Sequence, residues 1–239
     1  MSSLLLLETA TAVCSVGISR DNKLVSLKES HEGFSHAEKL TRFIEEACKE
    51  AKFTLQELDA IVVSSGPGSY TGLRIGVSTA KGLCFALDKP LIAVPTLAGI
   101  ATGMQKKWKE LKVEQSGEDE TRDILFIPMI DARRMEVYQA IYSKDLSEIQ
   151  PASAEIIEEN SFGSLLNDNQ IFLGGDGSAK LEELFSRQKD ITIWNDVLPS
   201  AANLLSIAEV KFKEKHFENT SLFEPFYLKE YIPGRTGQK

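Results

Sequence analysis

A glycine-rich loop follows a short β-branched run at residues 61–63 and precedes a helix-like pattern, an arrangement that often binds phosphate. A P-loop requires G-x-x-x-x-G-K-[ST] ahead of its helix, with the lysine reaching the phosphates. The nearest match starts at Gly76, ends in the reversed pair Lys81-Gly82 and lies inside the helical pattern. The dinucleotide fingerprint G-x-G-x-x-G also fails, because Thr71 stands where a glycine is needed. We therefore predict a structural glycine loop that contains Gly66, Pro67, Gly68 and Gly72.

Two other segments follow β-type runs and could line a nucleotide cleft, because open α/β sheets bind ligands at strand ends. The first is "ETAT" at residues 8–11, and the second is "GGDG" at residues 174–177. Their threonines could hydrogen-bond phosphate, but they also suit turns, and Asp176 could either face the cleft or stabilise its own turn. The residues of this predicted vestigial cleft are Glu8, Thr9, Thr11, Gly174, Gly175 and Asp176.

A third charged cluster, Asp131, Arg133 and Glu136, could in principle support acid–base chemistry. No nucleophile or metal ligand accompanies it, so we interpret Arg133 as paired with a carboxylate that fixes the lobe geometry. His31 and His36 are five residues apart, which is the wrong spacing for one helical face. The sequence therefore predicts neither a catalytic residue nor a metal site.

Composition and charge restrict the class of protein. The 239 residues carry 27 basic and 35 acidic side chains, for a net charge of −8, so the chain lacks the basic face with which a protein grips RNA by itself. The three cysteines, Cys14, Cys48 and Cys84, are far apart and predict neither a disulfide framework nor a zinc site. The apolar start at residues 4–7 is too short for a signal peptide or a membrane span, so we expect a cytoplasmic protein.

The elements that must position these residues follow an α/β order, with two strand–glycine-loop–helix units. We predict a first lobe over residues 1–100, completed by part of a C-terminal helix at about 200–216. A second lobe covers 101–239 and includes an acidic linker near 112–123 and an extended tail. Predicted strands lie at 4–7, 13–18, 23–28, 61–63, 90–94, 124–130, 136–142 and 171–173, and predicted helices at 35–52, 71–87, from 95 and from 199.

Several segments together give a specific family resemblance. "SSGPGSYTGLRIGVSTAKGL" resembles the signature of the TsaB family, also called YeaZ, and "LLLLETATAVCSVGI" is similar to its N-terminal strands. "DARRMEVYQAIY", "FLGGDG" and "PFYLKEYI" are similar to its later motifs. The resemblance covers residues 4 to 232 and is weakest in the acidic linker.

The resemblance implies an actin-like ATPase (ASKHA) fold, which is a duplicated RNase H-like α/β fold with two lobes of mixed sheet flanked by helices. It also implies a non-catalytic partner, without a cofactor, in the threonylcarbamoyladenosine modification of tRNA. In this family the partners are the catalytic subunit TsaD and the ATPase TsaE, and tRNA is met only through the complex. The alternatives are a small-molecule kinase or ATPase of the same fold and, less well supported, a peptidase.

The scaffold hypothesis places the partner on the two helices predicted at 35–52 and 71–87. Their apolar positions recur at spacings of three and four, which is also the pattern of a helix core face. A charge at Val77 or Ala80 should then abolish co-purification with TsaD, and an uncovered surface of this kind could instead produce a homodimer. The candidate contact positions are Phe43, Ile44, Ala47, Leu73, Val77 and Ala80.

Overall fold

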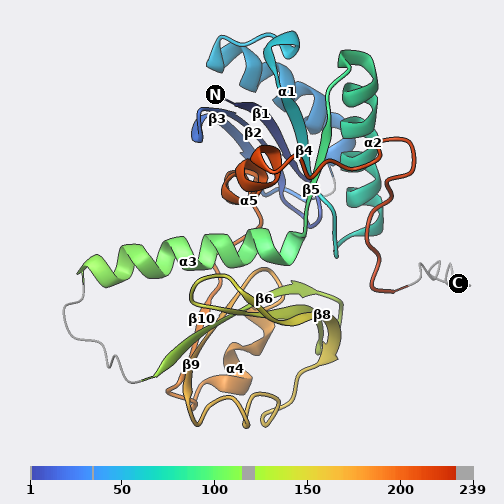
Figure 1. The fold of residues 1–239 in the computed structure, drawn as a ribbon. Coiled ribbons are helices and arrows are strands. Elements are labelled where there is room, and N and C mark those ends of the chain that lie inside the picture. Colours follow the sequence, from blue (N-terminus) through green and yellow to red (C-terminus); the bar gives the residue numbers. More distant parts are fainter. Residues whose placement is uncertain (1, 34, 115–121, 230–239) are drawn as a thin grey trace, which may run out of the picture.

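The computed structural model describes residues 2–33, 35–114 and 122–229. Two five-stranded mixed sheets form two lobes, and most of the helices lie on their faces (Figure 1). Among the described helices, none has the length and apolar content that crossing a membrane would require.

The first sheet has the strand order β3-β2-β1-β4-β5. β2 pairs antiparallel with both β1 and β3, whereas β4 runs parallel to β1 and to β5. The strands of this sheet are β1 (Ser3–Glu8), β2 (Cys14–Arg20), β3 (Lys23–Ser30), β4 (Ala60–Ser64) and β5 (Leu91–Val94).

The second sheet repeats the topology of the first. Its order is β10-β9-β6-β7-β8, so its first, second and third strands again form an antiparallel meander and its fourth and fifth add in parallel. This repeat confirms the duplicated two-lobe α/β fold that the resemblance implied. The strands are β6 (Asp123–Asp131), β7 (Glu136–Ser143), β8 (Glu148–Ile156), β9 (Asn169–Gly174) and β10 (Ile191–Trp194).

The first sheet is buried on both faces because its central strands β1 and β4 contain the continuous apolar runs 4–7 and 60–63. On β1, Leu5 and Leu7 face helices α1 (His36–Ala51) and α2 (Tyr70–Leu87), while Leu4 and Leu6 face helix α5 (Ala201–Lys213). All four leucines are fully buried. Burial of such a side chain contributes about 2 kcal/mol, so this strand anchors both layers of helices. The last helix therefore completes the first lobe (Figure 1).

The second lobe has one long helix and several short elements. Helix α3 (Thr96–Glu114) covers one face of the second sheet, through Trp108 and Met104, and also contacts α5. The opposite face packs against the segment around Phe162 and against the short helices η2 (Ala179–Leu181) and α4 (Glu182–Phe185). A further 3-10 turn, η1 (Leu55–Glu57), precedes β4. Of the acidic linker predicted at 112–123, residues 115–121 lie outside the described residues.

The C-terminal segment 217–229 forms a strap from the first lobe to the second (Figure 1). The Glu218 N–H donates to the Leu91 carbonyl at the sheet edge, and the Phe226 N–H donates to the Ser65 carbonyl over a distance of 2.7 Å. At the far end of the strap, the Lys229 ammonium forms an ion pair with Glu136 of β7. The strap therefore fixes the end of the chain to both lobes.

Candidate functional site: a closed cleft and an exposed helix flank

The glycine loop makes the tight strand-to-helix turn that the sequence predicts. Gly66 has a φ of +110°, which an L side chain rarely adopts. Ser69 is the N-cap of α2, and its hydroxyl accepts a hydrogen bond from the Gly72 N–H at 3.3 Å. The loop thus delivers α2 onto the first sheet with its first turn capped.

The glycines also let α2 approach the β1–β2 hairpin, residues 8–13, so closely that no side chain would fit at the glycine positions. A Cβ atom added at Gly72 would lie 2.1 Å from the Thr9 carbonyl oxygen, and one at Gly76 would lie 2.2 Å from Thr9 Oγ1. A Cβ at Gly68 would lie 2.3 Å from the Ala10 carbonyl oxygen. The start of α2 therefore rests directly on the backbone of the hairpin.

This contact closes the part of the predicted cleft that the hairpin contributes. Glu8, Thr9 and Thr11 are 1%, 0% and 6% exposed. Thr9 Oγ1 donates to the Gly72 carbonyl at 2.8 Å, and the Thr11 hydroxyl accepts from the Val13 N–H. The threonines thus serve packing and turn formation. A nucleotide does not fit these residues, because their side chains are buried and have partners within the chain.

Two carboxyl groups with raised pKa values lie at the junction of the lobes. Burial raises the pKa of Glu8 to about 7, and the nearby Asp176 carboxylate raises it further, although hydrogen bonds from the Ala10 N–H and the Ser64 hydroxyl oppose the effect. Burial, together with the charge of Asp131, raises the pKa of Asp176 to about 6. The junction therefore titrates near neutral pH.

The second half of the predicted cleft is a packed turn. Gly175 has a φ of +102°, and a Cβ there would lie 2.1 Å from the Met129 carbonyl oxygen. Gly174 packs against Met104 of α3, and Asp176 Oδ1 accepts from the Asp131 N–H at 3.3 Å. The turn is therefore held by close backbone contact. Within the described part of the chain, no group of three His, Cys, Asp or Glu residues could hold a metal ion.

The predicted pairing of Arg133 with a carboxylate is wrong. Asp131 forms its ion pair with Lys180, and Glu136 forms its ion pair with Lys229. Both lysines come from segments distant in sequence, which the local pattern could not indicate. The Arg133 guanidinium has no ion-pair partner among the described residues, and the side chain is exposed.

The positions predicted to contact a partner lie in the interior of the first lobe and not on its surface. All six are buried, and none is more than 6% exposed. All of them except Leu73 belong to the core cluster that includes residues of β1, β2 and β4. The apolar spacing therefore marks the core face of each helix. The six buried residues are Phe43, Ile44, Ala47, Leu73, Val77 and Ala80.

Helix α2 has a second series of residues on its opposite side, which we call the outer flank; all of them are exposed except Ile75, which is half-buried against the core. These positions also recur at alternating spacings of four and three, so they share one helical face. Phe85 is 90% exposed, an unusual position for a phenylalanine, and a Cβ at Gly82 would meet no atom within 4 Å. The outer flank consists of Thr71, Ile75, Ser78, Gly82 and Phe85.

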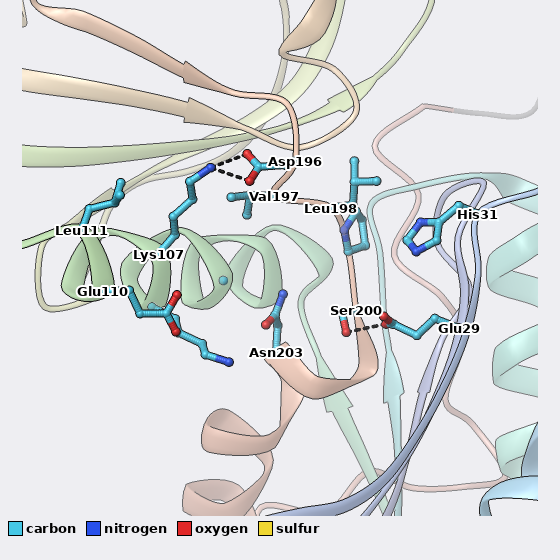
Figure 2. Close-up of a pocket in the computed structure, with 13 residues that line it drawn as sticks. Glu29, His31, Lys107, Glu110, Leu111, Asp196, Val197, Leu198, Ser200 and Asn203 are labelled. Atoms are coloured by element: carbon cyan, nitrogen blue, oxygen red, sulfur yellow. Dashed lines mark hydrogen bonds and ion pairs between the residues drawn. The ribbon is translucent and has the colours of Figure 1, made fainter. Parts of the chain in front are cut away.

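A cavity that the sequence did not indicate lies where the two lobes join (Figure 2). Its volume is about 480 Å³, and its lining comes from α3, the end of β3 and the connection to α5. Lys107 forms an ion pair with Asp196 at its wall, and the Ser200 hydroxyl donates to Glu29 at 2.6 Å (Figure 2). These two interactions connect α3 and β3 to the segment that leads into α5.

Comparison with known proteins identifies the family. The chain is 30% identical over 248 aligned positions to the tRNA threonylcarbamoyladenosine biosynthesis protein TsaB of Haemophilus influenzae, covering 98% of both chains. The chain belongs to the TsaB (YeaZ) family. TsaB of Escherichia coli is 27% identical and covers 96% of this chain, with 95% of its own length aligned.

The wider comparisons agree with membership of the TsaB family. A family model described as TsaD, tRNA N6-adenosine threonylcarbamoyltransferase, matches residues 32–231. A transferase of that name from Bacillus thuringiensis is 42% identical, but over only 38% of this chain and 30% of its own. The YeaZ structure from Pseudomonas aeruginosa superposes with a TM-score of 0.78 at 27% identity, covering 95% of this chain and all of the other.

The contact between α2 and the hairpin predicts opposite effects of two glycine substitutions in one helix. Gly72→Ala should lower the free energy of unfolding by about 1–3 kcal/mol, because its Cβ would overlap the Thr9 carbonyl. Gly82→Ala should raise it by about 0.5–1 kcal/mol, because alanine is the better helix former and the space is open. Urea denaturation of both variants measures the difference, and equal effects would contradict the close approach.

The raised pKa of Glu8 predicts a stability that falls as the pH rises. The folded chain holds this proton more tightly than the unfolded chain, so the contribution is fully present below the unfolded pKa of 4.5 and is lost as the pH passes about 7. Glu8→Gln should remove up to roughly 3 kcal/mol of this pH dependence. Denaturation at several pH values between about 5 and 8 tests it. Glu45→Gln on the exposed face of α1 is the matched control and should keep the wild-type slope.

Proposed function

We propose that this chain is a non-catalytic scaffold subunit required for threonylcarbamoyladenosine modification of tRNA, at the adenosine beside the anticodon in tRNAs that read codons beginning with A. It acts by binding and supporting a TsaD-type catalytic subunit, together with a TsaE-type ATPase, in the cytoplasm. The observation that carries the proposal is the closed hairpin in a chain similar to TsaB over its whole length.

The closed hairpin supports a role other than nucleotide chemistry. In a kinase or ATPase of this fold, the hairpin and the cleft must receive phosphates, but here α2 covers them. Among the described residues, no group of three His, Cys, Asp or Glu residues could hold a metal ion in their place, and the carboxylates of Asp131 and Glu136 are ion-paired with lysines. A small-molecule kinase or ATPase would therefore require α2 to move away from Thr9.

The outer flank of α2 supports the scaffold role. An exposed aromatic ring beside small residues is the composition of a helix that packs closely against another helix. The strap contacts α2 where the Lys81 ammonium donates to the Phe223 carbonyl, and it lines a pocket with Ser78 at the edge of the outer flank. The open part of the flank, around Gly82 and Phe85, is the side that we assign to a partner. We place the TsaD-type subunit there, and a second copy of this chain when no partner is present.

Substitution of Phe85 tests this placement. Phe85→Asp should reduce capture of a TsaD-type subunit at least tenfold, because it places a charge in the centre of the proposed contact. The fold should persist, since the side chain is 90% exposed. Val77→Glu cannot serve this purpose, because Val77 is a core residue and the variant should unfold.

The matched control is Ile149→Asp on the exposed edge strand β8 of the second lobe. It also places a carboxylate at an exposed apolar position, 57% exposed, and should leave capture unchanged. Capture is measured by co-purification, with circular dichroism as the check on folding. Full capture by a folded Phe85→Asp chain would move the interface away from the outer flank.

Reconstitution tests the function itself. A mixture of TsaD-type subunit, TsaE-type ATPase, tRNA, ATP and the threonylcarbamoyl donor should form modified tRNA only when this chain is added. Nucleotide turnover by the isolated chain is measured in parallel and should be absent. Modification at the full rate without the chain would reject the scaffold role, and turnover by the chain alone would favour the ATPase alternative.

A further inference from the structure

The turn between β6 and β7 contains two adjacent arginines in a conformation that arginine rarely adopts. Arg133 has a φ of 74° and Arg134 a φ of 51°. The turn is fixed by hydrogen bonds from the Ala132 N–H to the Glu136 carbonyl and from the Glu136 N–H to the Arg133 carbonyl, both 3.1 Å. Left-handed backbone costs a residue other than glycine about 1–2 kcal/mol, and asparagine or glycine would avoid most of that cost. Six other non-glycine residues of the described chain also have a positive φ, so the distinctive feature of this turn is that both of its left-handed residues are arginines.

Both guanidinium groups are also left without a partner. The nearby carboxylates, Asp131 and Glu136, are already neutralised by Lys180 and Lys229. In the part of the chain that the structure describes, neither arginine side chain takes part in an ion pair, a hydrogen bond or an aromatic contact, and both residues are exposed. Lysines from other elements thus balance the local acids, and the two arginines project positive charge from the tip of the hairpin.

The chemistry of guanidinium limits what such a pair would bind. Arginine is always charged and presents a planar set of donors that matches a phosphate or a carboxylate. The chain as a whole carries a net charge of −8, so its field repels a polyanion at long range. Two arginines would therefore bind RNA only when another subunit already holds it nearby.

We propose that Arg133 and Arg134 bind backbone phosphates of the tRNA within the assembled complex, an inference that rests on the proposed function. The hairpin belongs to the second lobe, whereas the outer flank of α2 belongs to the first. The strap joins the two regions, because Tyr227 packs against Tyr70 at the start of α2 and Lys229 pairs with Glu136 beside the hairpin, whereas Phe85 lies near the other end of the helix. A partner centred on Phe85 is therefore compatible with exposed arginines at the hairpin. The chain alone binds no tRNA measurably, and the arginines add phosphate contacts once the catalytic subunit has captured the substrate.

The test is a double variant that removes the charges and suits the backbone. Arg133→Asn with Arg134→Gly should keep or raise the melting temperature, because both residues tolerate a positive φ. In complex with a TsaD-type subunit, its affinity for tRNA should fall about tenfold at low salt. The slope of log affinity against log salt should fall by about 1.4–1.8, the value for two lost phosphate contacts. The apparent KM for tRNA should rise in the modification assay.

The matched control removes the same two charges elsewhere in the second lobe. Arg187→Gln with Lys189→Gln lies between α4 and β10, at exposed positions, and should preserve both the affinity and the salt slope. An equal loss in the control would show that only net charge matters and would overturn the proposed site.

Three other results would also overturn the inference. One is an unchanged tRNA affinity and salt slope in the hairpin variant. A second is loss of TsaD-type or TsaE-type subunit capture by that variant, which would assign the arginines to a protein carboxylate. The third is a weakened binding of ATP with tRNA binding intact, which would assign them to a nucleotide. If the wild-type chain is still required for modification, each result rejects this site and leaves the scaffold role standing.

Discussion

The close contact between the start of α2 and the β1–β2 hairpin is the constraint on which the rest of the first lobe depends. Gly72 and Gly76 bring the helix so near that Thr9 Oγ1 bonds to a helix carbonyl. This single approach closes the cleft side of the hairpin and presents the opposite side of α2 to solvent. The strap also packs closely against a glycine, because a Cβ at Gly66 would lie 2.3 Å from the Phe226 carbonyl oxygen. The glycines of this segment therefore allow both the hairpin and the strap to pack against its backbone.

The two lobes share a topology but differ in what covers their sheets. The first has long helices on both faces, whereas the second has α3 on one face and only short elements on the other. In the first lobe, the residues of the hairpin that could face a ligand between the two halves, Glu8, Thr9 and Thr11, are buried. The outer flank of α2 and the arginine hairpin, one on each lobe, are the surfaces to which we assign partner and phosphate binding.

Sequence reasoning recovered most strands of both sheets, because their central segments are continuous apolar runs. It missed β8 and β10. β8 is an exposed edge strand containing Pro151, and β10 has only four residues, so neither gives a strong hydrophobic pattern. It also assigned buried core positions of α1 and α2 to the partner contact. A helix with two series of positions at spacings of three and four has two candidate faces, and only the packed structure shows which one is the core.

The sequence shows the charged cluster at residues 131–136, but it does not show which charges pair in the folded chain. The motif displays carboxylates beside arginines, and local proximity suggests that they pair. In the folded chain, Lys180 and Lys229, 49 and 93 residues from their partners, take both carboxylates instead. A lysine is a flexible point charge that suits such a carboxylate, whereas an arginine fork held in a strained turn serves for directional recognition. Because the acids already have partners, the two guanidinium groups stay available to a ligand outside the chain, while the cost of the left-handed turn is offset by the folding of the chain itself.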